Sequence, residues 1–480
     1  MTTFQQSPVS TADQLCKLTA TEAVGLLKSR EISPLDLVDA AIDRIERVDT
    51  IVNALPLRRF DLARRTAKEF PKPTPEQAAA PGWLAGLPIA IKDYNDLAGL
   101  PTTSGSPIFA NHMPEGSDSV VQNLERHGAI PIAKSNVPEF AGANTFNRVF
   151  GPTRNPWNPE LTVGGSSGGS AAALAAGLVW LATGSDLGGS LRIPASYCGV
   201  VGMRPSVGRV ARSYAMNPFD PLVVEGPMGR CVADVALMLD AQANFNPLDP
   251  LSVPAPAKPY VDAIRQPVAP KRVGFTADLG VGLVDPEVAQ LCERAAQRLT
   301  EIGAEVDNGC PDFSDTFEAF QVLRANLLAG WRSDLLEAHR SELCPEIIWN
   351  IEKGLNQGGA DVARAERVRT QLYRRVGAFF QEYDLLACPT VSLPPFPVSE
   401  RFPKPNDGQE HSYIDWMYLT FVLTLTGCPV ISVPIGTTKD GRPVGLQLMG
   451  RPRADHEVLS AAHLLERIVD VARLVPRAPA

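Results

Sequence analysis

Two glycine-bracketed serine segments are the most unusual feature of this 480-residue sequence. Residues 164–170 read GGSSGGS and run into an alanine-rich stretch, and residues 184–190 read GSDLGGS and follow the apolar stretch 178–183. Small residues let backbone amides approach a ligand, and consecutive amides can hold an oxyanion. A serine beside such amides is a candidate nucleophile. The pair indicates a serine hydrolase, and the structural alternatives are a flexible linker for the first segment and a tight turn for the second.

The first segment spells GxSxG twice, centred on Ser166 and on Ser167. A nucleophile elbow has this spelling, but it also needs a strand that leads into it, and residues 154–163 are polar and interrupted by proline. A triad of that class would also use a late histidine, and His456 and His463 both lie on an amphipathic helical pattern. The elbow is therefore disfavoured, and so is a phosphate-binding loop, because the sequence has no GxxxxGK[ST].

Lysine is the alternative base, because burial can strip its ammonium group of a proton. Lys92 ends the apolar stretch LPIAIK, and Lys134 ends the similar stretch AIPIAK. A lysine at the end of a strand is usually a surface residue whose stem lies along apolar neighbours. The pattern alone does not choose between the two lysines.

The composition excludes several other classes of function. Lys and Arg number 45 against 53 Asp and Glu, a net charge of −8, and no basic run offers phosphates a path, so nucleic-acid binding is not expected. The eight cysteines form no CxxC pair and no Cys/His cluster at metal-ligand spacing, which predicts reduced thiols and no metal site. We expect neither a metal nor an organic cofactor.

The first residues, MTTFQQSPVSTADQ, lack the basic-then-apolar order of a secretory signal, and we expect the protein in the cytoplasm. Two uncharged stretches, 161–185 and 416–438, have the length of membrane spans. The first is rich in glycine and serine, and the second is cut by Gly427 and Pro429. Both are therefore assigned to buried helix and strand, and no membrane contact is expected.

The elements that must position the serines and lysines begin with an all-helical segment. Thr19 with Glu22 forms a capping box, and Ser33-Pro34 supplies a cap and a first-turn proline for the next helix. We expect residues 1–70 to form a helical wrap, which a proline-rich connector over 71–82 joins to the rest of the chain.

After this connector, strand-like and helix-like stretches alternate. Strands are expected at 87–91, 129–133, 178–183, 273–275, 385–387 and 430–434. Helices are expected at 117–126, 171–176, 285–302, 317–339 and 361–383. Because no further linker follows, residues 71–480 are predicted to form one compact α/β domain with a mixed, mostly parallel central sheet covered by helices. Ligands of such sheets bind at the carboxyl ends of strands, where residues 184–190 fall.

In several spaced motifs the sequence resembles the amidase signature enzymes. The motifs are LPIAIKD around Lys92, PTTSGS from Pro101, GGSSGGS from Gly164, SDLGGSLRIP from Ser185 and PVGLQLMG from Pro443. They occur in the family's order, and the resemblance extends over residues 18–468.

The resemblance implies a Ser-cisSer-Lys triad that hydrolyses an amide through an acyl-enzyme. Ser190 would be the nucleophile and Ser166 the bridging serine in a cis peptide. Lys92, rather than Lys134, would be the base. The backbone amides that would form the oxyanion hole are those of Leu187, Gly188, Gly189 and Ser190. The residues that would support the site are Ser167, Asp186 and Arg192.

The family includes hydrolases of aliphatic, aryl and fatty amides, ureas and carbamates, and the glutamine-hydrolysing component of the tRNA-dependent amidotransferase. Amidotransferases place Asp and Asn where this chain has Met417 and Thr424, which disfavours glutamine. The expected pocket residues are apolar or aromatic and favour a small uncharged or aryl amide as the substrate: Tyr94, Phe140, Phe146, Tyr214, Met216, Phe219, Met417 and Phe421. The alternatives are a tRNA-dependent amidotransferase component, a carbamate- or urea-type hydrolase and an inactive scaffold, and the oligomeric state, a homodimer included, is left open.

Overall fold

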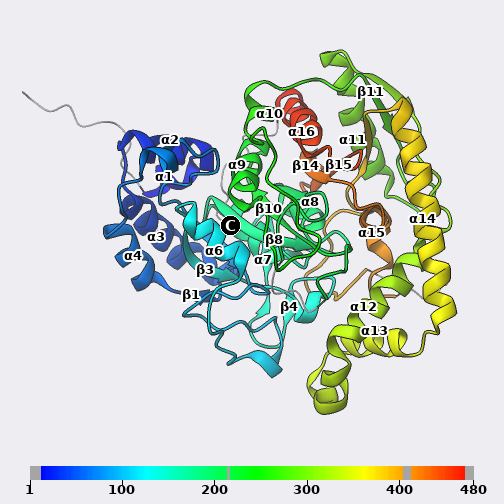
Figure 1. Cartoon of the computed structure of the whole chain (residues 1–480), viewed down its shortest axis with the longest axis horizontal. Coiled ribbons are helices and arrows are strands. Elements are labelled where there is room, and N and C mark those ends of the chain that lie inside the picture. The colour runs from blue at the N-terminus through cyan, green and yellow to red at the C-terminus, as the bar shows by residue number, and fades with distance from the viewer. Residues whose placement is uncertain (1–11, 213–216, 404–411, 471–480) are drawn as a thin grey trace, which may run out of the picture.

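A long sheet runs through the centre of the molecule in the computed structural model, which describes residues 12–212, 217–403 and 412–470 (Figure 1). Within these residues the sheet has 11 strands in the order β1-β3-β2-β8-β10-β9-β14-β15-β13-β11-β12. The strands are β1 (Leu57–Arg58), β2 (Pro88–Lys92), β3 (Ile130–Ser135), β8 (Leu181–Asp186), β9 (Val201–Arg204), β10 (Val224–Gly229), β11 (Arg272–Phe275), β12 (Glu305–Asn308), β13 (Leu385–Pro389), β14 (Val430–Thr437) and β15 (Pro443–Gly450). The expectation of a mixed sheet covered by helices is confirmed.

Most strand pairs in the described part of this sheet are antiparallel, so the expectation of a mostly parallel sheet is wrong in that detail. Parallel pairing is confined to β3-β2-β8 at one end and β13-β11-β12 at the other. Between them, β10 is antiparallel to both β8 and β9, and β14 and β15 form a hairpin around Gly441. A short connection can join only antiparallel neighbours, and the φ of 85° at Gly441 is one that glycine adopts without strain.

Two short hairpins lie outside the main sheet. They pair β4 (Phe146–Asn147) with β5 (Gly151–Pro152) and β6 (Arg154–Asn155) with β7 (Asn158–Thr162). The second hairpin directly precedes the first glycine–serine segment. No main-sheet strand therefore leads into that segment among the residues that the structure describes, which agrees with the case against a nucleophile elbow.

The N-terminal helices pack at the β1 end of the sheet (Figure 1). They are α1 (Ala12–Lys17), α2 (Ala20–Ser29), α3 (Pro34–Val52), α4 (Phe60–Lys68) and α5 (Pro75–Ala79). Helices α2 and α3 begin at capping boxes, Thr19 with Glu22 and Ser33 with Asp36, and the predicted proline lies in the first turn of α3. This helical segment is tied to the sheet, because β1 pairs antiparallel with β3.

The remaining helices pack against the sheet or against one another (Figure 1). They are α6 (Ser119–Arg126), α7 (Gly168–Ala175), α8 (Arg192–Cys198), α9 (Val232–Gln242), α10 (Asp262–Arg265), α11 (Pro286–Gln297), α12 (Thr316–His339), α13 (Pro345–Leu355), α14 (Gly359–Glu382), α15 (Tyr418–Thr424) and α16 (Asp455–Val469). Helix α13, for example, packs on α12. One large hydrophobic cluster joins the sheet to the N-terminal helices, α7, α9, α11 and α16, and a second draws on α12, α14 and α15. A smaller third cluster lies around Phe140 and α13.

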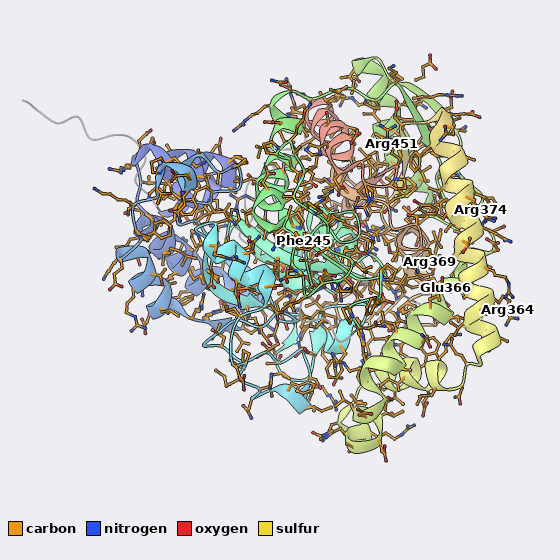
Figure 2. All side chains as sticks on the ribbon, viewed as in Figure 1. Phe245, Arg364, Glu366, Arg369, Arg374 and Arg451 are labelled. Carbon is orange, nitrogen blue, oxygen red and sulfur yellow. The ribbon has the colours of Figure 1, made fainter. Side chains whose placement is uncertain are left out.

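The two longest helices, α12 and α14, have 24 residues each. Helix α14 is amphipathic: Leu372 and Val376 are buried, whereas the charged side chains of Arg364, Glu366 and Arg374 are exposed along the helix (Figure 2). Across the described ranges, no helix combines the length and the apolar character that a membrane crossing requires.

Candidate active site

Lys92 is the last residue of β2 and is fully buried. Its Nζ donates to Ser166 Oγ at 2.8 Å, to Ser167 Oγ at 2.8 Å and to Ser185 Oγ at 2.9 Å. Nζ also lies 4.8 Å from the centroid of the Tyr94 ring. Lys92 thus brings the two glycine–serine segments together, with one amine among three hydroxyls inside the protein.

The environment of Lys92 favours the neutral amine. Burial lowers the pKa of Lys92 from 10.5 to about 7, and the carboxylates of Glu225 and Asp186 oppose this shift. Asp186 is already paired with Arg192 and Arg204. An amine that is half neutral near pH 7 can accept a proton from a hydroxyl group.

Lys134 is also fully buried, but it has a carboxylate partner. In the β2–β3 register Lys134 lies opposite Ile91, so its side chain leaves the sheet on the other face from Lys92. Its Nζ lies 2.7 Å from Asp93 Oδ1 and donates to Thr102 Oγ1 at 2.7 Å. Burial lowers the pKa of Lys134, and Asp93 opposes this shift from within ion-pair distance. The structure therefore separates the two lysines that the sequence pattern left equivalent.

Ser166 lies in the turn before α7, and the Gly165–Ser166 peptide bond is cis, the form that the resemblance implies. The glycines around it are required by close packing. A Cβ at Gly165 would lie 2.7 Å from a backbone oxygen, and a Cβ at Gly168 would lie 2.1 Å from Thr145 Oγ1. Glycine thus lets this turn pack against the preceding loop while Ser166 faces both Lys92 and a cavity.

Ser190 lies at the end of the second segment and lines the same cavity as Ser166 and Ser185. The cavity has a volume of about 210 Å³. The backbone ties the two segments together, because Ser167 N donates to Ser190 O at 3.2 Å. Within the part of the chain that the structure describes, the hydrogen-bonded route runs from Lys92 to Ser166, and the two hydroxyls of Ser166 and Ser190 share the cavity without a hydrogen bond between them. Catalytic hydrogen bonds of this kind often tighten only when substrate is bound.

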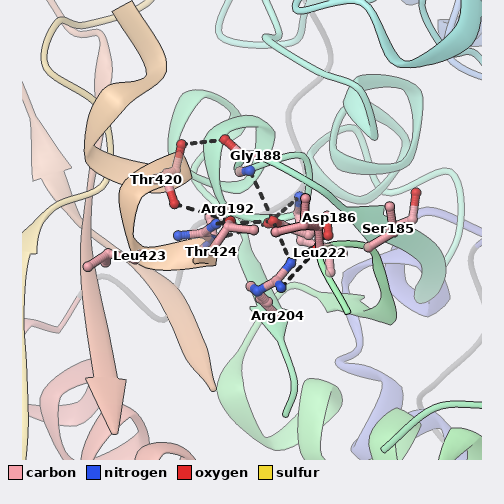
Figure 3. A network of polar contacts seen from close by, with 12 residues as sticks. Ser185, Asp186, Gly188, Arg192, Arg204, Leu222, Thr420, Leu423 and Thr424 are labelled. Atoms are coloured by element: carbon pink, nitrogen blue, oxygen red, sulfur yellow. Dashed lines mark hydrogen bonds and ion pairs between the residues drawn. The ribbon is translucent and has the colours of Figure 1, made fainter. Parts of the chain in front are cut away.

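The loop over residues 187–190 presents backbone amides beside Ser190, but one expected donor is already used. Gly189 N donates to Asp186 Oδ1 at 2.9 Å, so its assignment to the oxyanion hole is corrected. On its other side the loop is held by Thr420, whose Oγ1 donates to Gly188 O at 2.7 Å (Figure 3). The amides left for an oxyanion are those of Leu187, Gly188 and Ser190.

Asp186 holds this loop through a buried ionic network (Figure 3). Its carboxylate accepts from Arg192 Nε at 3.1 Å, from Arg192 Nη2 at 3.0 Å and from Arg204 Nη1 at 3.2 Å. Burial raises the pKa of Asp186, but Arg192 and Arg204 outweigh it and hold this pKa well below its usual range. Arg192 is anchored in turn by Gln447 and Thr424. Asp186, held by Arg192, therefore fixes the position of the loop over residues 187–190.

Asp186→Asn is expected to weaken both the fold and the oxyanion hole. Asparagine cannot neutralise Arg192 and Arg204, and a buried charge left unpaired costs about 3 to 5 kcal/mol of unfolding free energy. Asparagine keeps one acceptor for the Gly189 amide but holds Arg192 and Arg204 less firmly. The loop over residues 187–190, which carries the oxyanion amides, should therefore shift. We expect kcat to fall about 10²-fold, the effect of one displaced oxyanion donor. Denaturant unfolding and kcat of the folded variant check this. Thr420→Val is the control with the smaller loss, and a wild-type kcat for Asp186→Asn would contradict the role of the network.

Only part of the expected substrate pocket lines the cavity. Tyr94 and Phe140 do so. Phe146 instead lines a separate groove and is 40% exposed. Met417 and Phe421 are buried in the hydrophobic core. The expectation that Phe146, Met417 and Phe421 line the substrate pocket is therefore corrected. Residue type alone did not show the direction in which each side chain points.

Of the remaining expected pocket positions, only Phe219 lies within the described residues, and it does not line the cavity. Phe219 is 73% exposed to solvent. Tyr214 and Met216 lie outside the residues that the structure describes.

The cavity is more polar than the sequence predicted. Asp118, Arg212, Glu225 and Arg332 all line it, together with Trp331 of α12. For Glu225 the sequence does carry a signal, because it is a charged residue inside the apolar stretch VVEGPM, where a buried functional group can be suspected. The residues of α12 gave no signal, because they come close to Ser190 only in the folded chain.

The sequence and the fold of this chain are both similar to those of known proteins. The family model described as Amidase matches residues 36–459. An acylamidase of Rhodococcus erythropolis is 36% identical over 465 residues, which cover 95% of this chain and 97% of that protein. A glutamyl-tRNA(Gln) amidotransferase polypeptide of Moorella thermoacetica is 37% identical over 494 residues, with coverages of 96% and 99%. The crystal structure of a bacterial aryl acylamidase of the amidase signature family aligns with a TM-score of 0.84 at 30% identity, over 95% of this chain and 98% of that one.

The chain therefore belongs to the amidase signature family. It is an enzyme of the amide-hydrolase class.

Proposed function

We propose that this enzyme hydrolyses a small linear amide through an acyl-enzyme on Ser190, with Ser166 as the bridging serine and Lys92 as the base. The observation that carries the proposal is the 2.8 Å hydrogen bond from the buried Lys92 Nζ to Ser166 Oγ. Ser190 supports it, because its position in the cavity places it beside both Ser166 and the amides of the loop.

The proposed steps move one proton along this chain of groups. Neutral Lys92 takes the proton of Ser166 while Ser166 takes that of Ser190, whose Oγ bonds to the amide carbon. The carbonyl electron pair moves to oxygen, where the loop amides stabilise it. Collapse of this intermediate breaks the C–N bond, and the proton returns from Lys92 through Ser166 to the leaving amine. Water then attacks the acyl-enzyme in the same way and releases the acid.

The rate of acylation is expected to rise with pH through about 7 and to level off above it, because Lys92, whose pKa burial lowers to about 7, must be neutral. Below that pKa the rate should fall about tenfold per pH unit. Asp186 stays ionised over this range, whereas Glu225, whose pKa burial raises to about 7, titrates with Lys92 and broadens the transition. The rate of inactivation by a fluorophosphonate across pH measures this, and a flat profile between about pH 5 and 9 would contradict it.

The walls of the cavity and the relatives together favour acyl amides, including aryl amides. Tyr94, Phe140 and Trp331 supply aromatic surface beside Ser190. The names of two relatives, an acylamidase and an aryl acylamidase, agree with this class. Because charged groups also line the cavity, the proposed substrates include charged as well as uncharged amides.

A substrate panel tests this proposal. Acetamide, benzamide, acetanilide, a phenyl carbamate and glutamine are compared by kcat/KM, with release of the amine or ammonia as the readout. We expect the acyl or aryl amides to be turned over without any partner protein. Turnover of glutamine and of none of the other four compounds would contradict the proposal.

A tRNA-dependent amidotransferase component is the second candidate, and the 37% identity to the Moorella thermoacetica protein favours it. In that case ammonia would be released from glutamine only in the presence of a partner protein and an acceptor. The structure offers one argument against it, since Met417 is buried in the core and Thr424 is used by Arg192. Neither is placed to hold glutamine.

We also propose that the enzyme works in the cytoplasm. All eight cysteines lie in the described ranges and are free thiols. Unpaired cysteines are typical of proteins kept in a reducing compartment.

A further inference from the structure

Glu225 brings a carboxyl group into the cavity next to the proposed base. In the antiparallel pairing of β10 with β8, Glu225 lies directly opposite Ser185. Residues paired in this way point to the same face of the sheet, and Ser185 Oγ accepts from Lys92 Nζ at 2.9 Å. Both Glu225 and Ser185 line the cavity with Ser190. A group bound by Glu225 would therefore lie in the same cavity as the proposed nucleophile Ser190.

Two acceptor atoms in this cavity have no partner. Within the described residues, Glu225 Oε2 and Asn95 Oδ1 are both buried and make no hydrogen bond. Asn95 is 5% exposed, and its Nδ2 donates to Asp118 Oδ2 at 3.3 Å. Its Oδ1 must then point away from Asp118. Hydrogen bonding from the Asn95 side chain also acts to lower the pKa of Glu225, so the two groups are neighbours. A buried acceptor without a donor is disfavoured, so this arrangement is complementary to a ligand that brings donors.

The two cations that act on Glu225, Arg212 and Lys92, already have protein partners. Arg212 Nη1 donates to Val223 O at 2.9 Å. The guanidinium group of Arg332 lies 4.6 Å from the centroid of the Phe140 ring. Beside Glu225, therefore, the acceptor atoms rather than Arg212 or Lys92 are what the cavity offers to a small molecule.

We propose that Glu225 and Asn95 form a subsite for a protonated amino group of the substrate, carried on a short chain from the scissile amide. The inference rests on the proposed function for the position of that amide at Ser190. An ammonium group has three donors and a charge opposite to that of a carboxylate, so it matches the two acceptors better than a hydroxyl or a methyl group does. Glu225 and Asn95 would thus determine specificity without taking part in bond breaking.

Binding to the Ser190→Ala variant tests the subsite without relying on turnover. Three isosteric pairs are titrated by NMR just above pH 7: glycinamide with propionamide, 3-aminopropionamide with butyramide, and 4-aminobutyramide with pentanamide. In each pair an ammonium group replaces a methyl group. We expect at least one amine to bind about tenfold or more tightly than its alkyl partner, as charge-assisted hydrogen bonds would predict.

Glu225→Gln in the same background keeps the size and one acceptor but removes the charge. We expect it to abolish the preference for the amine and to leave binding of the alkyl amide within about twofold. Equal binding of amine and alkyl amide by Ser190→Ala would overturn the subsite, and so would an equal loss of both ligands in Glu225→Gln. Failure of the proposed function would appear separately, as absence of turnover and of fluorophosphonate labelling in the wild-type enzyme.

Discussion

Replacing Lys92 by methionine is expected to lower kcat/KM for amide hydrolysis by at least about 10³-fold, because general-base catalysis is lost. Methionine keeps the length and the apolar stem of the side chain but cannot take a proton from Ser166. The 2.8 Å contact between Lys92 Nζ and Ser166 Oγ would be lost, and with it the base that takes this proton. The fold should remain, because replacing a buried amine by an apolar group removes a desolvation penalty. Steady-state kinetics and denaturant unfolding measure the two effects.

The neighbouring strand β3 supplies a matched control. Lys134→Met deletes an equally buried amine, but it leaves Asp93 without its ion-pair partner and should cost about 3 to 5 kcal/mol of unfolding free energy. In the folded fraction, kcat/KM should stay within about tenfold of the wild-type value. We therefore expect Lys92→Met to be stable but inactive. Lys134→Met should be less stable but active. The reverse assignment of activity would show that Lys134 is the base.

Ser190→Ala is expected to lower kcat by at least about 10⁴-fold, because no acyl-enzyme can form. Ser119→Ala removes a hydroxyl from the same cavity and should change kcat by less than about threefold. Residues that act as one unit are not additive, so the double variant of Ser190→Ala and Lys92→Met should be no slower than Ser190→Ala alone. A measurable burst of acylation in Ser190→Ala would assign the nucleophile to another serine.

Several long periodic elements could be predicted from the sequence, whereas helix α9 and the central strands β9, β10 and β15 could not. Helices α12 and α14 and strands β2 and β3 begin and end within a few residues of their predicted bounds. Strands β9 and β10 were missed, because glycines interrupt their apolar pattern. Packing requires these glycines: a Cβ at Gly226 would lie 2.4 Å from the backbone oxygen of Met203. The same close packing places β10 between β8 and β9 and makes the centre of the sheet antiparallel.

The polar centre of the site was easier to predict than the cavity around it. The serines stood out by their glycines, but the sequence pattern could not choose between Lys92 and Lys134. That choice depends on Asp93, which follows Lys92 in the chain and pairs with Lys134 across the sheet. The prediction of aromatic pocket residues was partly wrong for a related reason. Phe421, for example, stacks on Phe320 in the core, with 4.4 Å between the ring centroids. Only the folded chain shows which face of a helix borders the cavity.

The most direct test of the central claim, that Lys92 activates Ser190 through Ser166, is mass-spectrometric mapping of a fluorophosphonate adduct. The proposed mechanism predicts one adduct on the peptide that contains Ser190 in the wild-type protein and in Lys134→Met. It predicts essentially no adduct in Lys92→Met. An adduct on Ser167, or undiminished labelling of Ser190 in Lys92→Met, would contradict it.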